Sequence, residues 1–245
     1  LSDNPNDSAA NLLFAQLMIE TGDGFAAENS LKKVGMGQLP EVEKQVLLAR
    51  SDILKGQFKP AIARLNTQLK KEGSEDVLYW LGFAHIENET ISDNIEIIKE
   101  GAKTYPKSAK MEMLLARYAS QYQTYFDARH HAGLALEYAP EDYDVLIFNG
   151  QVQLYQGALE EARVHYKKAS DLFPNDAFSL AVTAGIDLDL GKIESAKNIM
   201  AQSNIRNSNH WFVHFQKARL AFLTGDSPAD GQFCTSDPAC RRSGV

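Results

Sequence analysis

Apolar and small residues recur in this chain with the spacing of amphipathic helices. Between Pro140 and Pro174, two successive stretches carry such residues three and four positions apart. They are Leu146, Asn149, Gly150 and Gln153 in the first stretch, and Ala162, Tyr166 and Ala169 in the second. Gly157 separates the stretches, and Pro174 ends the second because proline cannot continue a helix. The pattern predicts two short helices joined by a tight turn.

The same hairpin pattern recurs along the chain at a nearly constant interval. The small residue of the first helix repeats every 34 positions, apart from one interval of 33 between the second and third units. These residues are Ala15, Ala49, Gly82, Ala116, Gly150, Ala184 and Ala218. The second helix has its own small residue at Ala27, Ala61, Ala128, Ala162 and Ala196, with Asn94 as the exception. Because one hairpin cannot bury both of its faces, we expect adjacent hairpins to stack.

The turn inside each hairpin keeps the same register. Glycine occupies this position at Gly22, Gly56, Gly157, Gly191 and Gly225, and the two other units have Glu89 and Gln123. Glycine is favoured after a helix because it has no Cβ.

These recurring residues resemble the tetratricopeptide repeat (TPR) family, in which a large residue, Leu-Gly, an aromatic, Ala, an aromatic, Ala and Pro recur over 34 positions. The resemblance covers residues 1–226, as six full units and the first helix of a seventh. The expected units are 8–41, 42–74, 75–108, 109–142, 143–176, 177–210 and the half unit 211–226. The resemblance implies an all-α fold, a right-handed superhelical solenoid of antiparallel helix pairs with about thirteen helices.

One position departs from the family pattern. The aromatic residue usual in the first helix is replaced by Met18, Asp52, His85, Ala119, Gln153, Asp187 and Ala221. We therefore expect looser packing than in a consensus array, and modest stability.

The last residues, 227–245, contain Pro228, Gly231 and Pro238 and show no helical period, so we expect an irregular or disordered tail. Both cysteines, Cys234 and Cys240, lie in it. Their spacing matches no common zinc motif, and a local disulfide remains open. The chain starts without Met or a signal peptide, and we expect it to be part of a longer protein.

Composition narrows the classes of partner. The 245 residues are 44% hydrophobic and carry a formal net charge of −7. This charge argues against nucleic acid, because phosphate binding requires a basic surface. The sequence contains no run of 18 apolar residues, the length expected of a membrane-spanning helix.

No catalytic or metal-binding constellation is evident, so we expect no enzyme activity, no cofactor and no metal. His130 and His131 are adjacent and would point apart on a helix. His210 and His214 have the spacing of a zinc pair, but no third ligand is near in sequence and His210 falls in the turn before a helix.

The concave groove, lined by the first helices in TPR arrays, is the expected binding surface. Polar and apolar residues occupy two of its positions in successive units. The predicted partner-binding residues are Gln16, Arg50, Tyr79, Phe83, Met113, Arg117, Ile147, Gln151, Phe215 and Arg219. The planar guanidinium group of arginine can donate two hydrogen bonds to a carboxylate or to backbone carbonyls. The ligand could be an extended segment or a helix of a partner protein. The alternative, equally open, is that the arginines pair with acids of an adjacent unit, for example Glu43, Asp76 or Glu87.

Three functions follow as hypotheses. The first is a protein–protein interaction scaffold. The second is a structural part of a bacterial envelope assembly for exopolysaccharide or pili, because the segment 47–58 is similar to TPR lipoproteins of exosortase-linked systems; it would favour the envelope over the cytoplasm. The third, an enzyme or its accessory domain, has no supporting motif. The apolar terminal helix 211–224 further predicts concentration-dependent homodimerisation.

Overall fold

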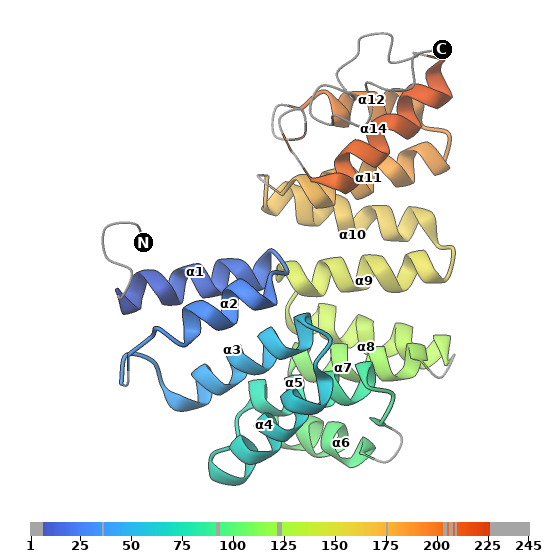
Figure 1. Ribbon diagram of the computed structural model, residues 1–245. Coiled ribbons are helices and arrows are strands. Elements are labelled where there is room, and N and C mark those ends of the chain that lie inside the picture. The colour runs from blue at the N-terminus through green and yellow to red at the C-terminus, as the bar shows by residue number, and fades with distance from the viewer. Residues whose placement is uncertain are drawn as a thin grey trace. The chain divides into compact units, whose positions relative to one another are not determined.

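The computed structural model describes residues 7–35, 37–91, 94–121, 124–174, 176–202, 205, 208 and 210–225. Within these ranges the chain forms thirteen helices and no strand, as predicted (Figure 1). The helices belong to two compact units, Leu1–Pro140 and Glu141–Val245. Each unit is described separately below.

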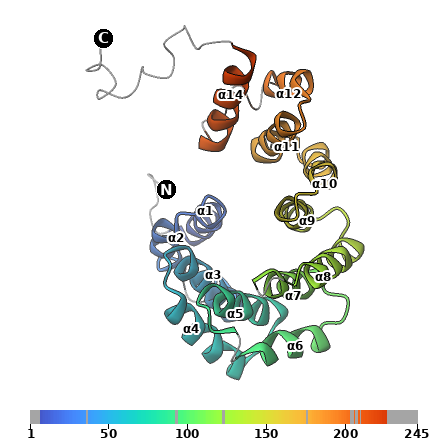
Figure 2. The same cartoon turned by 90° about the vertical axis from the view of Figure 1, so that its right-hand side faces the viewer.

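The first unit is a row of helix pairs. Its helices are α1 (Ser8–Glu20), α2 (Gly24–Leu31), α3 (Glu41–Leu54), α4 (Phe58–Lys71), α5 (Glu75–Glu87), α6 (Ile95–Thr104), α7 (Ala109–Gln121) and α8 (Tyr125–Tyr138). Each helix packs on the next, and α1, α3, α5 and α7 also contact one another in order. Figure 2 shows these four helices along the inner side of the first unit, with α2, α4, α6 and α8 outside them.

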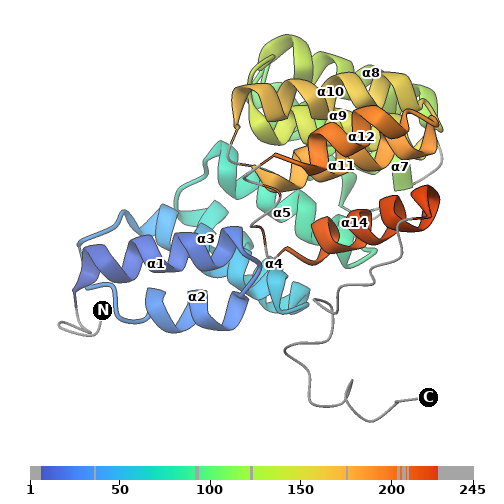
Figure 3. The ribbon, with the colours of Figure 1, turned by 90° about the horizontal axis from the view of Figure 1, so that it is seen from above.

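The second unit is also built from packed helix pairs. It contains α9 (Tyr143–Tyr155), α10 (Leu159–Leu172), α11 (Ala177–Asp189), α12 (Ile193–Met200) and α14 (Trp211–Thr224). Helix α10 packs between α9 and α11, and α14 packs on both α11 and α12. Figure 3 shows these helices from above.

Side-chain caps explain where several first helices begin. Asp7 and Asp142 each accept a hydrogen bond at 3.0 Å from the backbone N–H three residues ahead, and Ser74 does so at 3.3 Å. Asp176 accepts two such bonds, from Phe178 and Ser179. These bonds satisfy N–H groups that have no partner inside the helix.

The predicted small positions form the core between the helices. In the first helices, Ala15, Ala49, Gly82, Ala116, Gly150 and Ala184 are all buried. In the second helices, Ala27, Ala61, Ala128, Ala162 and Ala196 are buried too. A Cβ on Gly150 would lie 2.5 Å from the ring of the buried Tyr166, so only glycine allows this close approach.

Two members of the small-residue register behave differently. Ala218 is exposed, since no second helix covers α14 in the part of the chain that the structure describes. Asn94 lies outside its helix as the N-cap of α6. Close packing in α6 comes instead from Gly101, where a Cβ would lie 2.6 Å from the Met111 sulfur.

The turn position requires an unusual backbone. Its glycines have positive φ angles: 85° at Gly22, 70° at Gly56, 73° at Gly157, 72° at Gly191 and 70° at Gly225. Glu89 adopts the same conformation, with φ 57°, although it has a Cβ. Gln123 and the predicted tail with its cysteines lie outside the described residues.

Charged residues fill two of the positions where the family has an aromatic residue. Asp52 is buried and accepts hydrogen bonds from Lys55 at 2.9 Å and Arg64 at 3.2 Å. Asp187, also buried, binds Arg163 of α10 through both carboxylate oxygens. At these two positions, polar contacts occupy space where looser packing was expected. The modest stability of the fold stays a prediction.

Candidate functional site

An aromatic cluster lies on α5, in the middle of the inner row of the first unit. The Trp80 ring meets Tyr79 edge-on, with centroids 5.1 Å apart, and meets Phe83 in the same way at 5.4 Å. Tyr79 is buried, whereas Trp80 and Phe83 keep part of their surface exposed. The buried Tyr79 ring packs against the partly exposed rings of Trp80 and Phe83, which a partner can reach.

Two arginines from the neighbouring first helices stack on this cluster. The Arg50 guanidinium of α3 lies 4.8 Å from the Trp80 ring centroid, and that of Arg117 on α7 lies 5.2 Å from the Phe83 centroid. Such stacking holds a guanidinium flat on the ring while its N–H groups point outward from its edge. We call Arg50, Trp80, Phe83 and Arg117 the arginine–aromatic cluster.

The sequence predicted three members of this cluster and missed Trp80. Trp80 lies beside Tyr79 but outside the two helix positions used to choose groove residues. The Arg50–Trp80 contact joins residues 30 positions apart on different helices, and helix periodicity alone does not reveal such a pair. The available signal was the density of aromatic residues at 79–83.

The arginines also contact acids of the preceding helix pair. Arg50 Nη2 lies 3.4 Å from Glu20 Oε1, and Arg219 of the second unit binds Asp189. Both acids precede their arginine by 30 residues. Pairing within the chain therefore occurs at these two arginines, with acids other than those suggested from the sequence. Asp76, one of the suggested acids, receives Lys110 at 2.6 Å.

The remaining predicted groove residues have mixed exposure. Met113 in the first unit and Ile147 in the second are buried, which leaves little of their surface for a partner. Gln16 on α1 and Gln151 on α9 are half-buried. Four of the ten predicted residues lie in the second unit: Ile147, Gln151, Phe215 and Arg219.

The second unit contains a smaller version of the cluster. The Arg219 guanidinium lies 5.9 Å from the ring of Phe215, which is half exposed, and Arg219 also donates to Gln216 at 3.0 Å. Arg219 also pairs with Asp189, so its guanidinium already has several polar partners within the chain. Among the described residues, Arg50 has a single long ionic contact, with Glu20. The first unit is therefore the better candidate site.

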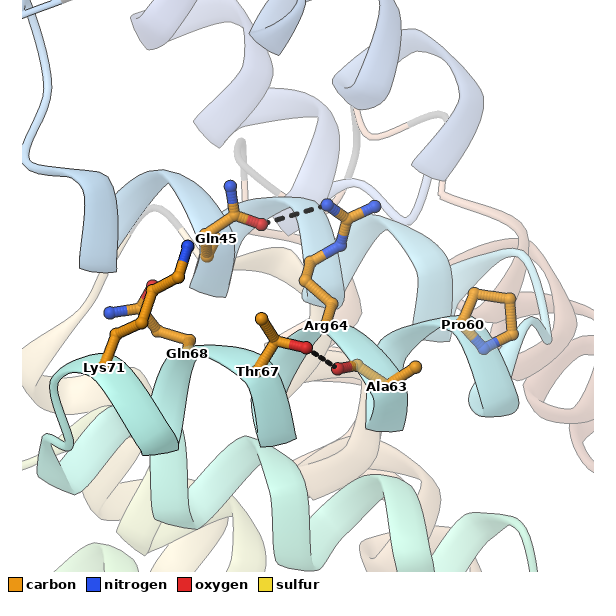
Figure 4. A pocket seen from close by; sticks show the side chains of 7 residues that line it. All are labelled: Gln45, Pro60, Ala63, Arg64, Thr67, Gln68 and Lys71. Carbon is orange, nitrogen blue, oxygen red and sulfur yellow. Dashed lines mark hydrogen bonds between the residues drawn. The ribbon is translucent and has the colours of Figure 1, made fainter.

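A polar hollow of about 410 Å³ lies between α3 and α4 (Figure 4). It is lined by Gln45, Pro60, Ala63, Arg64, Thr67, Gln68 and Lys71. Arg64 donates to Gln45 at 3.0 Å and to Asp52, and the Thr67 hydroxyl donates to the Ala63 carbonyl at 2.8 Å. Several groups of the wall are thus already hydrogen-bonded within the chain, and its lining residues include no nucleophile paired with a base.

Two of the histidines, His131 and His210, make structural contacts. His131 Nδ1 lies 2.7 Å from a Glu112 carboxylate oxygen, and His210 caps α14 by accepting from the Phe212 N–H at 3.3 Å. His210 thus precedes the helix, as predicted. No group of three or more metal-binding side chains is present among the residues that the structure describes.

None of the described helices is both long and apolar enough to cross a lipid bilayer.

No protein-family model and no curated protein matches the chain. The suggested resemblance to exopolysaccharide lipoproteins is accordingly not confirmed, and an envelope role stays a prediction.

Solved structures of TPR proteins do match. A thermophilic TPR protein from Thermus thermophilus has a TM-score of 0.59 at 17% identity, covering 74% of this chain and 100% of that one. A TPR protein from Parabacteroides merdae has a TM-score of 0.55 at 12% identity, covering 89% and 87%. The Cut9–Hcn1 hetero-tetramer of the APC/C has a TM-score of 0.60 at 14% identity, covering 88% and 46%. The chain therefore has the fold of tetratricopeptide repeat proteins, a solenoid built from stacked helix pairs.

Proposed function

We propose that this protein is a protein–protein interaction scaffold, which holds a segment of its partner on the inner face of the first unit. The arginine–aromatic cluster carries the proposal. Trp80 and Phe83 remain partly exposed at the centre of a helix row, although large aromatic side chains stabilise a fold most when fully buried. Aromatic residues and arginine are also the types enriched where proteins bind one another.

The charge distribution supports the same surface. The chain has a formal net charge of −7, yet two arginines flank the partly exposed rings. Arg50 has one long ionic contact, at 3.4 Å, with the exposed Glu20, and such surface contacts contribute little to folding. The Nε of Arg50 is buried without a hydrogen-bond partner among the described residues. The Arg50 side chain as a whole is 27% exposed, so a partner that accepts hydrogen bonds would bind its accessible part and not the buried Nε.

The similarity in fold is compatible with this role, since one of the similar structures is a hetero-tetramer. The cluster contains no nucleophile with an adjacent base, and the proposal therefore includes no catalytic step. An extended segment or a helix could each lie along the row of first helices.

The test compares capture of partners from an extract of the source organism by wild type and by an Arg50→Glu, Arg117→Glu double variant. The matched control is a Lys70→Glu, Arg129→Glu double variant, which makes the same charge change at exposed positions on α4 and α8. We expect a partner identified by mass spectrometry that wild type and control retain and the cluster variant loses. Circular dichroism must show that all three proteins are folded. Equal recovery with the folded cluster variant would place binding elsewhere.

A further inference from the structure

The arginine–aromatic cluster has a linear order that limits its length. Three successive steps connect one guanidinium to the other: 4.8 Å from Arg50 to Trp80, 5.4 Å from Trp80 to Phe83, and 5.2 Å from Phe83 to Arg117. The two guanidinium carbons therefore lie no further apart than these steps together, about 15 Å. Two positive charges thus bracket one apolar surface.

An extended segment matches this order in a specific register. Its side chains alternate between faces, and it advances about 3.3 Å per residue, so positions i, i+2 and i+4 share one face over roughly 13 Å. The distance from i to i+4 lies below the upper limit of about 15 Å on the separation of the two guanidinium carbons, and in this register the group at i+2 would lie over the rings. Carboxylates suit the guanidinium edges because both are planar forks, and an apolar group suits the rings.

Resting on the function proposed above, we infer that the inner face of the first unit selects segments of the form acidic–x–apolar–x–acidic. The two carboxylates bind Arg50 and Arg117, and the apolar side chain covers Trp80 and Phe83. The formal net charge of −7 opposes the binding of an acidic segment in general, so this ligand depends on its direct contacts with the two arginines.

Glu20 competes with the ligand for Arg50. Its carboxylate is 70% exposed and reaches the guanidinium by one contact at 3.4 Å, so a ligand carboxylate can displace it. Glu20→Gln removes this competing charge and keeps the shape of the side chain. The affinity for the ligand should therefore increase about two- to fivefold, of the order expected for one exposed ion pair. If the Arg50–Glu20 contact only joined neighbouring helix pairs, Glu20→Gln would leave ligand affinity unchanged.

Tryptophan fluorescence can follow binding at the cluster itself. The chain has two tryptophans, and Trp211 lies in the second unit, so Trp211→Phe leaves Trp80 as the reporter. This protein is titrated at low salt with a blocked peptide whose core is Asp-Ser-Leu-Ser-Asp. Comparison peptides replace both Asp by Asn, replace Leu by Ser, or remove one Ser to shift the register.

We expect a saturable change in Trp80 fluorescence with the first peptide and at least tenfold weaker binding of each comparison peptide. Arg50→Gln should weaken binding about tenfold, and Arg50→Lys, which keeps the charge without the planar fork, should weaken it less. Glu20→Gln should strengthen it. No saturable change, equal binding of the Asn peptide, or no effect of Arg50→Gln in a folded protein would overturn the inference.

The capture experiment separates this inference from the proposed function. A partner lost by the cluster variant, combined with no peptide binding, rejects the acidic–apolar–acidic ligand and leaves the scaffold role supported. Peptide binding with no partner lost supports the ligand chemistry and contradicts the scaffold role at this site. Failure of both rejects both.

Discussion

Glu89 is one of two described residues other than glycine with a positive φ, the other being Lys107. It takes the turn position with φ 57°, where the equivalent Gly157 has φ 73°. A residue with a Cβ in this left-handed region is less stable than glycine by about 1 kcal/mol. Since Glu89 is exposed, its side chain gains little in return.

We therefore expect Glu89→Gly to raise the free energy of unfolding of the first unit by about 1 kcal/mol. The reverse change, Gly157→Ala, should lower that of the second unit by a similar amount, because no atom lies within 4 Å of the added Cβ and only the backbone conformation is affected. Thermal and urea unfolding followed by circular dichroism would measure both. A loss of stability in Glu89→Gly would contradict this explanation.

Among the helices, ion pairs join one helix pair to the next. Glu28 on α2 binds Lys32, the C-cap of its own helix, and Lys55, the C-cap of α3, each at 2.7 Å. Lys55 also binds Asp52 at 2.9 Å. The hydrogen bond from Lys32, followed by that from Lys55, lowers the pKa of Glu28 from 4.5 to about 2. A carboxyl whose pKa is lowered by folding stabilises the fold above its unfolded pKa and stops doing so as pH falls through the folded value.

The contribution of Glu28 is therefore complete above pH 4.5 and disappears as pH falls towards 2. At pH 7 we expect Glu28→Gln to be less stable than wild type by about 1 kcal/mol, because the partly buried Glu28 carboxylate pairs weakly with the solvated Lys32 and more strongly with the buried Lys55. The two proteins should approach the same stability near pH 2. Unfolding curves at pH 7, 4 and 2.5 would show this convergence. Glu43→Gln, at an exposed position on α3, serves as control; a constant difference between wild type and Glu28→Gln at all three pH values would rule out this origin.

On the scale of the whole molecule, α14 carries apolar side chains that no other described residue covers. Trp211 is 70% exposed, Phe222 is 85% exposed, and Phe215 and Leu223 are about half exposed. We expect this surface to support the predicted homodimer, with sedimentation velocity showing a species that grows with concentration. Phe222→Ser should weaken the association, whereas Phe126→Ser on α8, an equally exposed phenylalanine, should not. A strictly monomeric wild type at high concentration would exclude self-association through α14.

The repeat register predicted the fold well and the site only in part. Small positions such as Ala15 and Gly150 are buried as expected, because a solenoid reuses the same close contact in every helix pair. The exposure of Ala218 was not predictable from the register, since burial at that position depends on a following helix. Two of the arginines predicted from helix position, Arg50 and Arg117, stack on the rings of Trp80 and Phe83. That a partner binds these groove residues stays a prediction. Helix position did not separate the partly exposed Trp80 from the buried Tyr79.

The sequence by itself determined the helix pairs, their length and their close-packed positions, because these depend on periodicity and on glycine or alanine where backbones approach. Only the tertiary structure decided which side chains meet a charged group. Asp187 pairs with Arg163 and Glu28 pairs with Lys55. Arg50 contacts Glu20 and the Trp80 ring. Long charged side chains can reach several neighbours within a few ångströms, and the rotation of each helix against the next selects among them. Sequence spacing leaves that rotation undefined, and the chemistry of the candidate site depends on it.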